Sequence, residues 1–78
     1  MKYTFVFYTH AGAIKFKKEC EKLKIDCDLM PVPRKLSSNC GIGAQVITEK
    51  YEILISDDVE KVFCGEVSNP KLVYENEL

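Results

Sequence analysis

The sequence predicts an α+β domain with a ferredoxin-like split β-α-β sandwich, in which two helices cover one face of a four-stranded antiparallel sheet. Three observations lead to this prediction. The chain has 78 residues, which suffices for a single domain spanning residues 1–78. Its apolar residues alternate in some segments and recur at helical spacing in others. The resulting elements follow the order β-α-β-β-α-β, and right-handed crossovers then bring the strands into one sheet.

The composition excludes several classes of protein. Hydrophobic residues make up 46% of the chain, with only four glycines and three prolines, so a disordered or collagen-like chain is excluded. The formal net charge of −1 gives no general attraction to phosphate backbones or anionic lipid, and we expect neither nucleic acid nor a membrane as a partner. A domain this small leaves no room for a large substrate cavity. Any chemistry would therefore take place at a surface loop or an edge.

The cysteines and the opening segment bear on the compartment. Residues 2–8 are too short for the apolar core of a signal peptide, and no stretch approaches the roughly 20 apolar residues that a membrane span needs. The four cysteines at positions 20, 27, 40 and 64 could form two disulfides in three connectivities. Without a secretory signal, reduced thiols are the better expectation. We therefore expect a small, soluble, cytoplasmic domain.

The first half of the chain predicts a strand, a helix and two further strands. Residues 3–8 favour a strand, and Thr9 or His10 can cap the helix that follows. Apolar residues then fall on one helical face, while the lysines of the same segment form a solvated face. Residues 25–30 alternate and predict a half-buried strand, bordered by prolines. After a loop over residues 34–41, residues 42–47 are again β-prone. The residues expected to face inward are Ala13, Phe16, Cys20, Leu23, Ile25, Cys27 and Leu29.

Residues 49–63 permit two interpretations. Their apolar residues fit a helical stripe, which favours one helix from about Glu49 to Phe63. The alternative is a strand over residues 51–55, followed by a short helix that Asp57 caps and Glu60 completes as a capping box. We prefer the single helix. A last short strand is expected over residues 71–74.

The predicted topology gathers polar residues at one edge. The loop after the first strand, the loop between the second and third strands, and the end of the second helix would share this edge. The residues expected there are Thr9, His10, Arg34, Ser37, Ser38, Cys40 and Cys64.

Cys40 is the strongest candidate for chemistry. Cys20 and Cys27 fall on apolar faces and are expected to be small buried hydrophobes. Cys40 instead follows the Ser37 and Ser38 hydroxyls and precedes Gly41, whose N–H is unobstructed. Arg34, Lys35 and a helix N-terminus are expected nearby, and such surroundings stabilise a thiolate and make it nucleophilic. The alternative is an inert loop cysteine.

The other candidate residues have accessory roles, and the sequence lacks the motifs of common cofactor sites. Cys64 could act as a resolving thiol and His10 as a base or charge partner, although structural roles are commoner for both. The chain lacks the paired ligand spacing of a zinc site, and a strand rather than a helix follows Gly41-Ile42-Gly43, so no dinucleotide fingerprint is present. The basic glycine–aromatic motif of RNA-recognition modules is also missing. We expect no cofactor and no metal.

Residues 31–41 carry a family resemblance. The run Pro31-Val32-Pro33-Arg34, followed by Ser37-Ser38 and Cys40-Gly41, resembles the signature of the DUF3343 family, described as selenium/sulfur carrier protein-like. The similarity extends from the opening strand and the Thr-His-Ala helix start to the closing Val-Tyr-Glu strand. Cys64 and the pair Asp57-Asp58 lie outside the pattern. The resemblance implies that Cys40 carries the sulfur or selenium atom.

Residues and resemblance together lead to a functional expectation. We expect a carrier or accessory protein rather than a stand-alone enzyme, with Cys40 accepting sulfur or selenium as a persulfide from a donor protein and passing it to an acceptor protein. Arg34, Lys35, Ser37 and Ser38 would stabilise the anionic sulfur. The alternatives are a non-catalytic interaction module, in which an open sheet face with Tyr8 and Ile47 mediates docking or a homodimer, and a redox-sensing Cys40–Cys64 pair.

Overall fold

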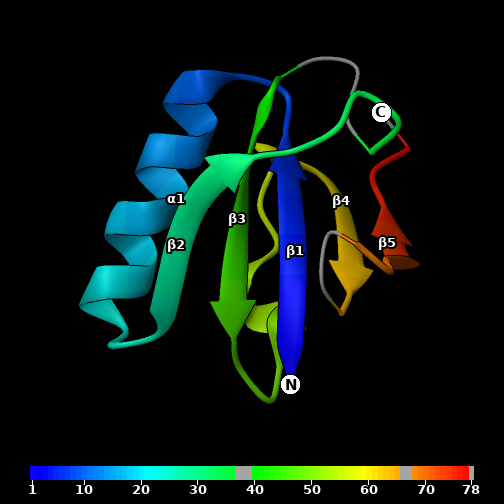
Figure 1. Cartoon of the computed structure of the whole chain (residues 1–78). Coiled ribbons are helices and arrows are strands. Elements are labelled where there is room, and N and C mark those ends of the chain that lie inside the picture. Colours follow the sequence, from blue (N-terminus) through cyan, green and yellow to red (C-terminus); the bar gives the residue numbers. More distant parts are fainter. Residues whose placement is uncertain (37–39, 66–67, 78) are drawn as a thin grey trace.

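The computed structural model describes residues 1–36, 40–65 and 68–77, and Figure 1 shows one antiparallel sheet with a helix against it. The strands lie in the order β2-β3-β1-β4-β5. In chain order the elements are β1 (Lys2–Phe7), α1 (His10–Lys22), β2 (Asp26–Pro31), β3 (Ile42–Ile47), the 3-10 helix η1 (Tyr51–Leu54), β4 (Val59–Cys64) and β5 (Lys71–Glu75).

The prediction of a two-helix, four-stranded ferredoxin-like sandwich is wrong. The sheet has five strands, and α1 is the one α-helix among the described residues. The helix expected from Glu49 to Phe63 is replaced by η1, a turn and β4. The alternative, a strand over residues 51–55 before a short helix, is wrong as well. β4 lies beside β1, and the predicted last strand is present as β5 at the sheet edge.

A β-bulge explains why β4 resembles a helix in sequence. Phe7 pairs with Val59 and Phe5 with Val62, so the register shifts by one residue between Val6 and Phe7. The extra residue on β4 is Glu60. Because of this insertion, Val59 and Val62 both face the same core although they are three residues apart. A spacing of three is what a helical stripe shows, which is why the pattern was misleading.

The start of α1 follows from its cap. Thr9 has an extended backbone, and its side-chain oxygen accepts a hydrogen bond from the Gly12 N–H at 3.0 Å. The expected inward face is confirmed at Ala13, Phe16 and Cys20, which are buried. Leu23 is 48% exposed because it is the C-terminal cap rather than part of the helix face.

The main core lies between α1 and the sheet. Phe16 of α1 contacts Phe5 and Phe7 of β1, with ring centroids 4.6 Å and 5.0 Å apart. Cys20 and Cys27 are buried in the same cluster, as the sequence predicted. These tilted ring contacts add to the burial of apolar surface, and this cluster is the larger of the two cores.

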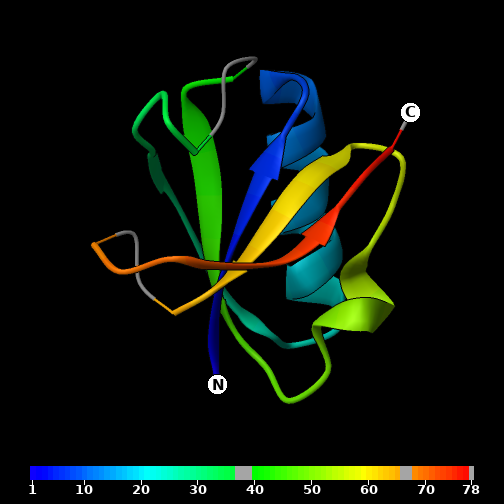
Figure 2. The same cartoon turned by 90° about the vertical axis from the view of Figure 1, so that its right-hand side faces the viewer.

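A second, smaller core covers the other face of the sheet. Figure 2 shows α1 on one side and the segment after β2 on the opposite side. We call residues Val32–Leu36 the apolar strap, because Val32 and Leu36 are buried against Val6 of β1 and Phe63 of β4. Gly43 permits this close approach: a Cβ there would lie 2.7 Å from Val32 Cγ1. The strap therefore sits directly on the sheet.

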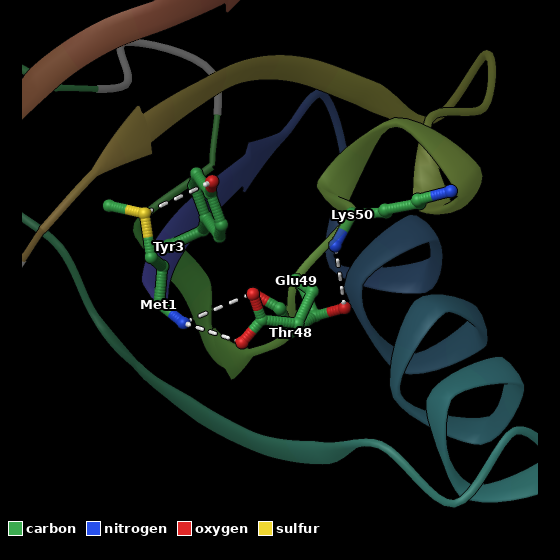
Figure 3. Close-up of polar contacts among 5 residues, drawn as sticks. All are labelled: Met1, Tyr3, Thr48, Glu49 and Lys50. Atoms are coloured by element: carbon green, nitrogen blue, oxygen red, sulfur yellow. Dashed lines mark hydrogen bonds and ion pairs between the residues drawn. The ribbon is translucent and has the colours of Figure 1, made fainter.

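The N-terminus is bound to the residues that follow the end of β3 (Figure 3). The Met1 ammonium donates to the Thr48 carbonyl at 3.3 Å and forms an ion pair with the Glu49 carboxylate at 3.8 Å. The Thr48 N–H donates to the Met1 carbonyl at 3.0 Å, which extends the β1–β3 pairing. Glu49 is 92% exposed, so its ion pair contributes little to stability.

Among the described residues, no helix is long and apolar enough to cross a membrane.

Candidate functional site

Cys40 lies in the connection between the apolar strap and β3. It is only 4% exposed, and its thiol donates to the Ile42 carbonyl at 3.6 Å. The sequence predicted a thiol on an open loop, where no core would cover it. The structure instead buries the Cys40 side chain, so a reagent or partner cannot approach the sulfur freely.

The described residues close to Cys40 in the sequence include two exposed cations and an open glycine. Arg34 and Lys35 are exposed in a turn in which the Leu36 N–H donates to the Pro33 carbonyl at 3.0 Å. Gly41 is exposed, and apart from its two chain neighbours no described residue would lie within 4 Å of a Cβ at this position. The predicted partners Ser37 and Ser38 lie outside the described residues. Positive charge is thus available on the surface close in sequence to the thiol.

His10 and Thr9 lie at the same end of the sheet as this loop. We call this the loop end, where β1 and β2 finish and β3 begins (Figure 1). His10 is exposed and opens α1. The Thr9 side chain is engaged in capping α1. The predicted shared edge is therefore confirmed for the start of α1 and the loop before β3.

Cys64 does not belong to this group. It pairs with Tyr3 of β1, whereas Gly43, near Cys40, pairs with Val6. From Tyr3 to Val6 the strand advances about 10 Å, at about 3.4 Å per residue. Cys64 therefore lies toward the opposite end of the sheet, and the prediction that it joins Cys40 and His10 is wrong. The reason is that residues 59–64 run down the sheet as β4 rather than up its face as a helix.

Cys20 and Cys27 are unsuited to nucleophilic chemistry. Burial raises the pKa of the Cys20 thiol to about 12, and the neighbouring Cys27 thiol adds to this shift. Burial also raises the pKa of Cys27, although a hydrogen bond from Cys20 and the charge of Lys17 oppose the shift. Thiols that stay protonated are poor nucleophiles. Both cysteines act as core residues, as expected.

Two features of the structure have no counterpart among the predicted site residues. Val32 and Leu36 anchor the loop that carries Cys40, and their apolar character in an otherwise polar segment was the available signal. A separate groove of about 270 Å³ lies between α1 and η1, on the other face of the sheet. It is lined by Lys15, Phe16, Glu19, Ile53, Leu54, Ile55, Ser56 and Asp58. Among the described residues, no three His, Cys, Asp or Glu side chains are grouped to hold a metal ion.

Comparison with known families decides the relationship. A family model described as "Putative Se/S carrier protein-like" matches residues 2–60. The chain belongs to this family. The resemblance seen at residues 31–41 is thereby confirmed, and Cys40 lies inside the matched part of the selenium/sulfur carrier-like family. Cys64 and β5 lie beyond it. Neither a curated protein nor a solved structure matches the chain.

Proposed function

We propose that this protein carries sulfur or selenium on Cys40 between a donor protein and an acceptor protein. The observation that carries the proposal is the family match over residues 2–60, which contains Cys40 in the loop that most resembles the family signature. The matched part contains two other cysteines, Cys20 and Cys27, and both belong to the main core. We therefore assign the carrier role to Cys40.

The transfer is an exchange between a thiol and a persulfide. The Cys40 sulfur attacks the outer sulfur of a persulfide on the donor, the donor's S–S bond breaks, and the donor cysteine leaves as a thiolate. A new S–S bond forms on Cys40, and the Cys40 thiol proton goes to solvent. The acceptor's nucleophile then attacks the outer sulfur, and Cys40 leaves as a thiolate. No external oxidant or reductant is needed, because each step breaks one bond to sulfur and forms another.

The positive charges close to Cys40 in the sequence support an anionic cargo. Arg34 and Lys35 are exposed on the strap, and a persulfide is negatively charged near neutral pH. Gly41 leaves open space next to Cys40, so a partner's backbone can approach the loop there. Donor and acceptor would dock at the loop end of the sheet in turn.

Sulfur loading tests the proposal. The protein is incubated with a cysteine desulfurase and cysteine, and the intact mass is measured before and after treatment with a thiol reductant. We expect the native chain and Cys64→Ser to gain one reducible sulfur atom, and Cys40→Ser to gain none. Equal loading of Cys40→Ser and the native chain, or no loading of either by several desulfurases, would reject Cys40 as the carrier.

A further inference from the structure

Resting on the proposed carrier role of Cys40, we propose that the apolar strap conceals this thiol and that sulfur transfer requires the strap to leave the sheet. The juxtaposition behind this proposal is a buried cysteine held between two fixed points, the docked strap on one side and the start of β3 on the other. The strap would thus work as a built-in cover for the reactive group.

The burial of Cys40 is incompatible with direct exchange. A partner must bring its persulfide sulfur into contact with Cys40 Sγ, in line with the bond that breaks. At 4% exposure the side chain leaves no room for such an approach. The thiol also donates to the Ile42 carbonyl, a bond that a thiolate cannot make, and the thiolate is the nucleophile. Reaction therefore requires another arrangement of this segment.

Local contacts hold the described part of this segment. Cys40 belongs to no helix or strand. The Val32 N–H donates to the Gly41 carbonyl at 2.9 Å, which joins the beginning of the strap to the residue after Cys40. Val32 and Leu36 are 8% and 4% exposed and pack on Val6 and Phe63. Loss of these two apolar contacts would release the strap from the sheet.

Release of the strap need not disturb the rest of the fold. The cluster of Val6, Val32, Leu36 and Phe63 is separate from the main core under α1. Local opening of a segment with few buried contacts costs less than global unfolding. Cys20, which is fully buried in the main core, should therefore remain protected when Cys40 becomes exposed.

Thiol labelling distinguishes local release from global unfolding. Cys64→Ser serves as the background, because Cys64 is partly exposed and would label first. Leu36→Ala removes a strap contact, and Leu54→Ala is the matched control, since Leu36 and Leu54 are 4% and 5% exposed in different clusters. The rates at which iodoacetamide modifies Cys40 and Cys20 are measured separately by peptide mass spectrometry.

We expect Leu36→Ala to speed the labelling of Cys40 by on the order of tenfold or more, while Cys20 stays protected. Leu54→Ala should raise the two rates together, if it raises either. The proposal is overturned if Cys40 of the background protein labels as fast as it does in urea-unfolded chain. It is also overturned if Leu36→Ala affects Cys40 no more than Leu54→Ala does.

A second measurement covers the case in which Leu36→Ala does not fold. In the background protein, the Cys40 labelling rate should rise less steeply with urea than the Cys20 rate, because local release exposes less surface than unfolding. Equal slopes would overturn the proposal. Iodoacetamide reacts without a sulfur donor. The labelling results therefore test whether the strap covers Cys40, whether or not Cys40 takes up sulfur. Conversely, sulfur loading at the same rate with and without Leu36→Ala would overturn the strap and leave the carrier role standing.

Discussion

Gly43 shows how a single residue sets the geometry of the site. It lies in β3 where the strap crosses the sheet, and a Cβ would meet Val32 Cγ1 at 2.7 Å and the Phe5 carbonyl oxygen at 2.8 Å. Both distances are shorter than real Cβ contacts allow. A Cβ at Gly41, two residues earlier, would point into open space. Two neighbouring glycines therefore have different reasons to be there.

Alanine substitution separates these two glycines. We expect Gly43→Ala to lower the free energy of unfolding by about 1 to 3 kcal/mol, since the strap or β1 must shift to admit the methyl group. Gly41→Ala should stay within about 0.5 kcal/mol of the native chain. Urea unfolding followed by circular dichroism measures both. A Gly43→Ala protein as stable as Gly41→Ala would show that the strap does not lie this close to β3.

The buried Cys20 thiol predicts a loss of stability at high pH. Its pKa is about 12 in the folded chain against an ordinary value of 9.0, so above pH 9 the unfolded chain releases a proton that the folded chain keeps. The free energy of unfolding should fall as pH rises from about 9 toward 12, by up to about 1.4 kcal/mol per pH unit from this thiol. Below pH 9 this effect is absent.

Comparison with Cys20→Ala isolates the contribution of this thiol, because Cys27 and the raised pKa values of Tyr3 and Tyr8 act in the same direction. Urea unfolding at pH 8, 9 and about 10.5 gives the slope of each protein. The slope should be shallower in Cys20→Ala. Identical slopes would mean that Cys20 is not the buried thiol described here.

At the scale of elements, α1 and β4 depend on different kinds of signal. Thr9 caps α1 through a hydrogen bond from Gly12, three residues along the chain, and such a local contact can be predicted from the sequence. β4 depends on its pairing with β1 and β5, whose residues lie far away in the chain. Its bulge at Glu60 gives it an apolar spacing typical of a helix. Local contacts therefore make α1 predictable, and long-range contacts hide β4.

The cap makes a simple prediction for α1. Thr9→Ala should lower the free energy of unfolding by about 1 kcal/mol, because the Gly12 N–H loses its acceptor. Thr9→Ser keeps a hydroxyl at this position and should remain near the native stability. Thermal and urea unfolding measure the difference. If Thr9→Ser is destabilised as much as Thr9→Ala, the methyl group rather than the hydroxyl supports the helix.

On the scale of the whole molecule, the sheet separates α1 from the strap and Cys40 from Cys64. α1 covers one face and the strap covers the other (Figure 2). Cys40 belongs to the loop end, whereas Cys64 pairs with Tyr3 near the N-terminus. A disulfide requires Cα atoms within about 4.4 to 6.8 Å, which is less than the separation along β1 alone. The fold therefore keeps the two thiols apart.

Oxidation tests this separation. When the folded protein is treated with glutathione disulfide, Cys64 should form a mixed disulfide because its side chain is partly exposed. A Cys40–Cys64 disulfide should be absent from the products, and peptide mapping under non-reducing conditions detects either species. A Cys40–Cys64 peptide as the main product of folded protein would contradict the strand pairing of β4.

Much of the fold could be predicted from residues that contact near neighbours. Alternation predicts strands over residues 3–8 and 25–30, which are present as β1 and β2, and the β-prone residues 42–47 are present as β3. The start of α1 follows from Thr9. The burial of Cys20 and Cys27 follows from their apolar faces. The family resemblance depends on the order of residues in the loop and needs no coordinates.

The sequence by itself therefore determined the capped helix, the strands β1, β2, β3 and β5, the inert cysteines and the family. Tertiary structure alone decided that residues 59–64 form a strand, since the bulge at Glu60 exists only against β1. It also decided that Cys40 is concealed and that Cys64 lies apart from it. Burial and strand position depend on which distant residues meet. Spacing along the chain records one face of an element, but it does not record the partner that covers that face.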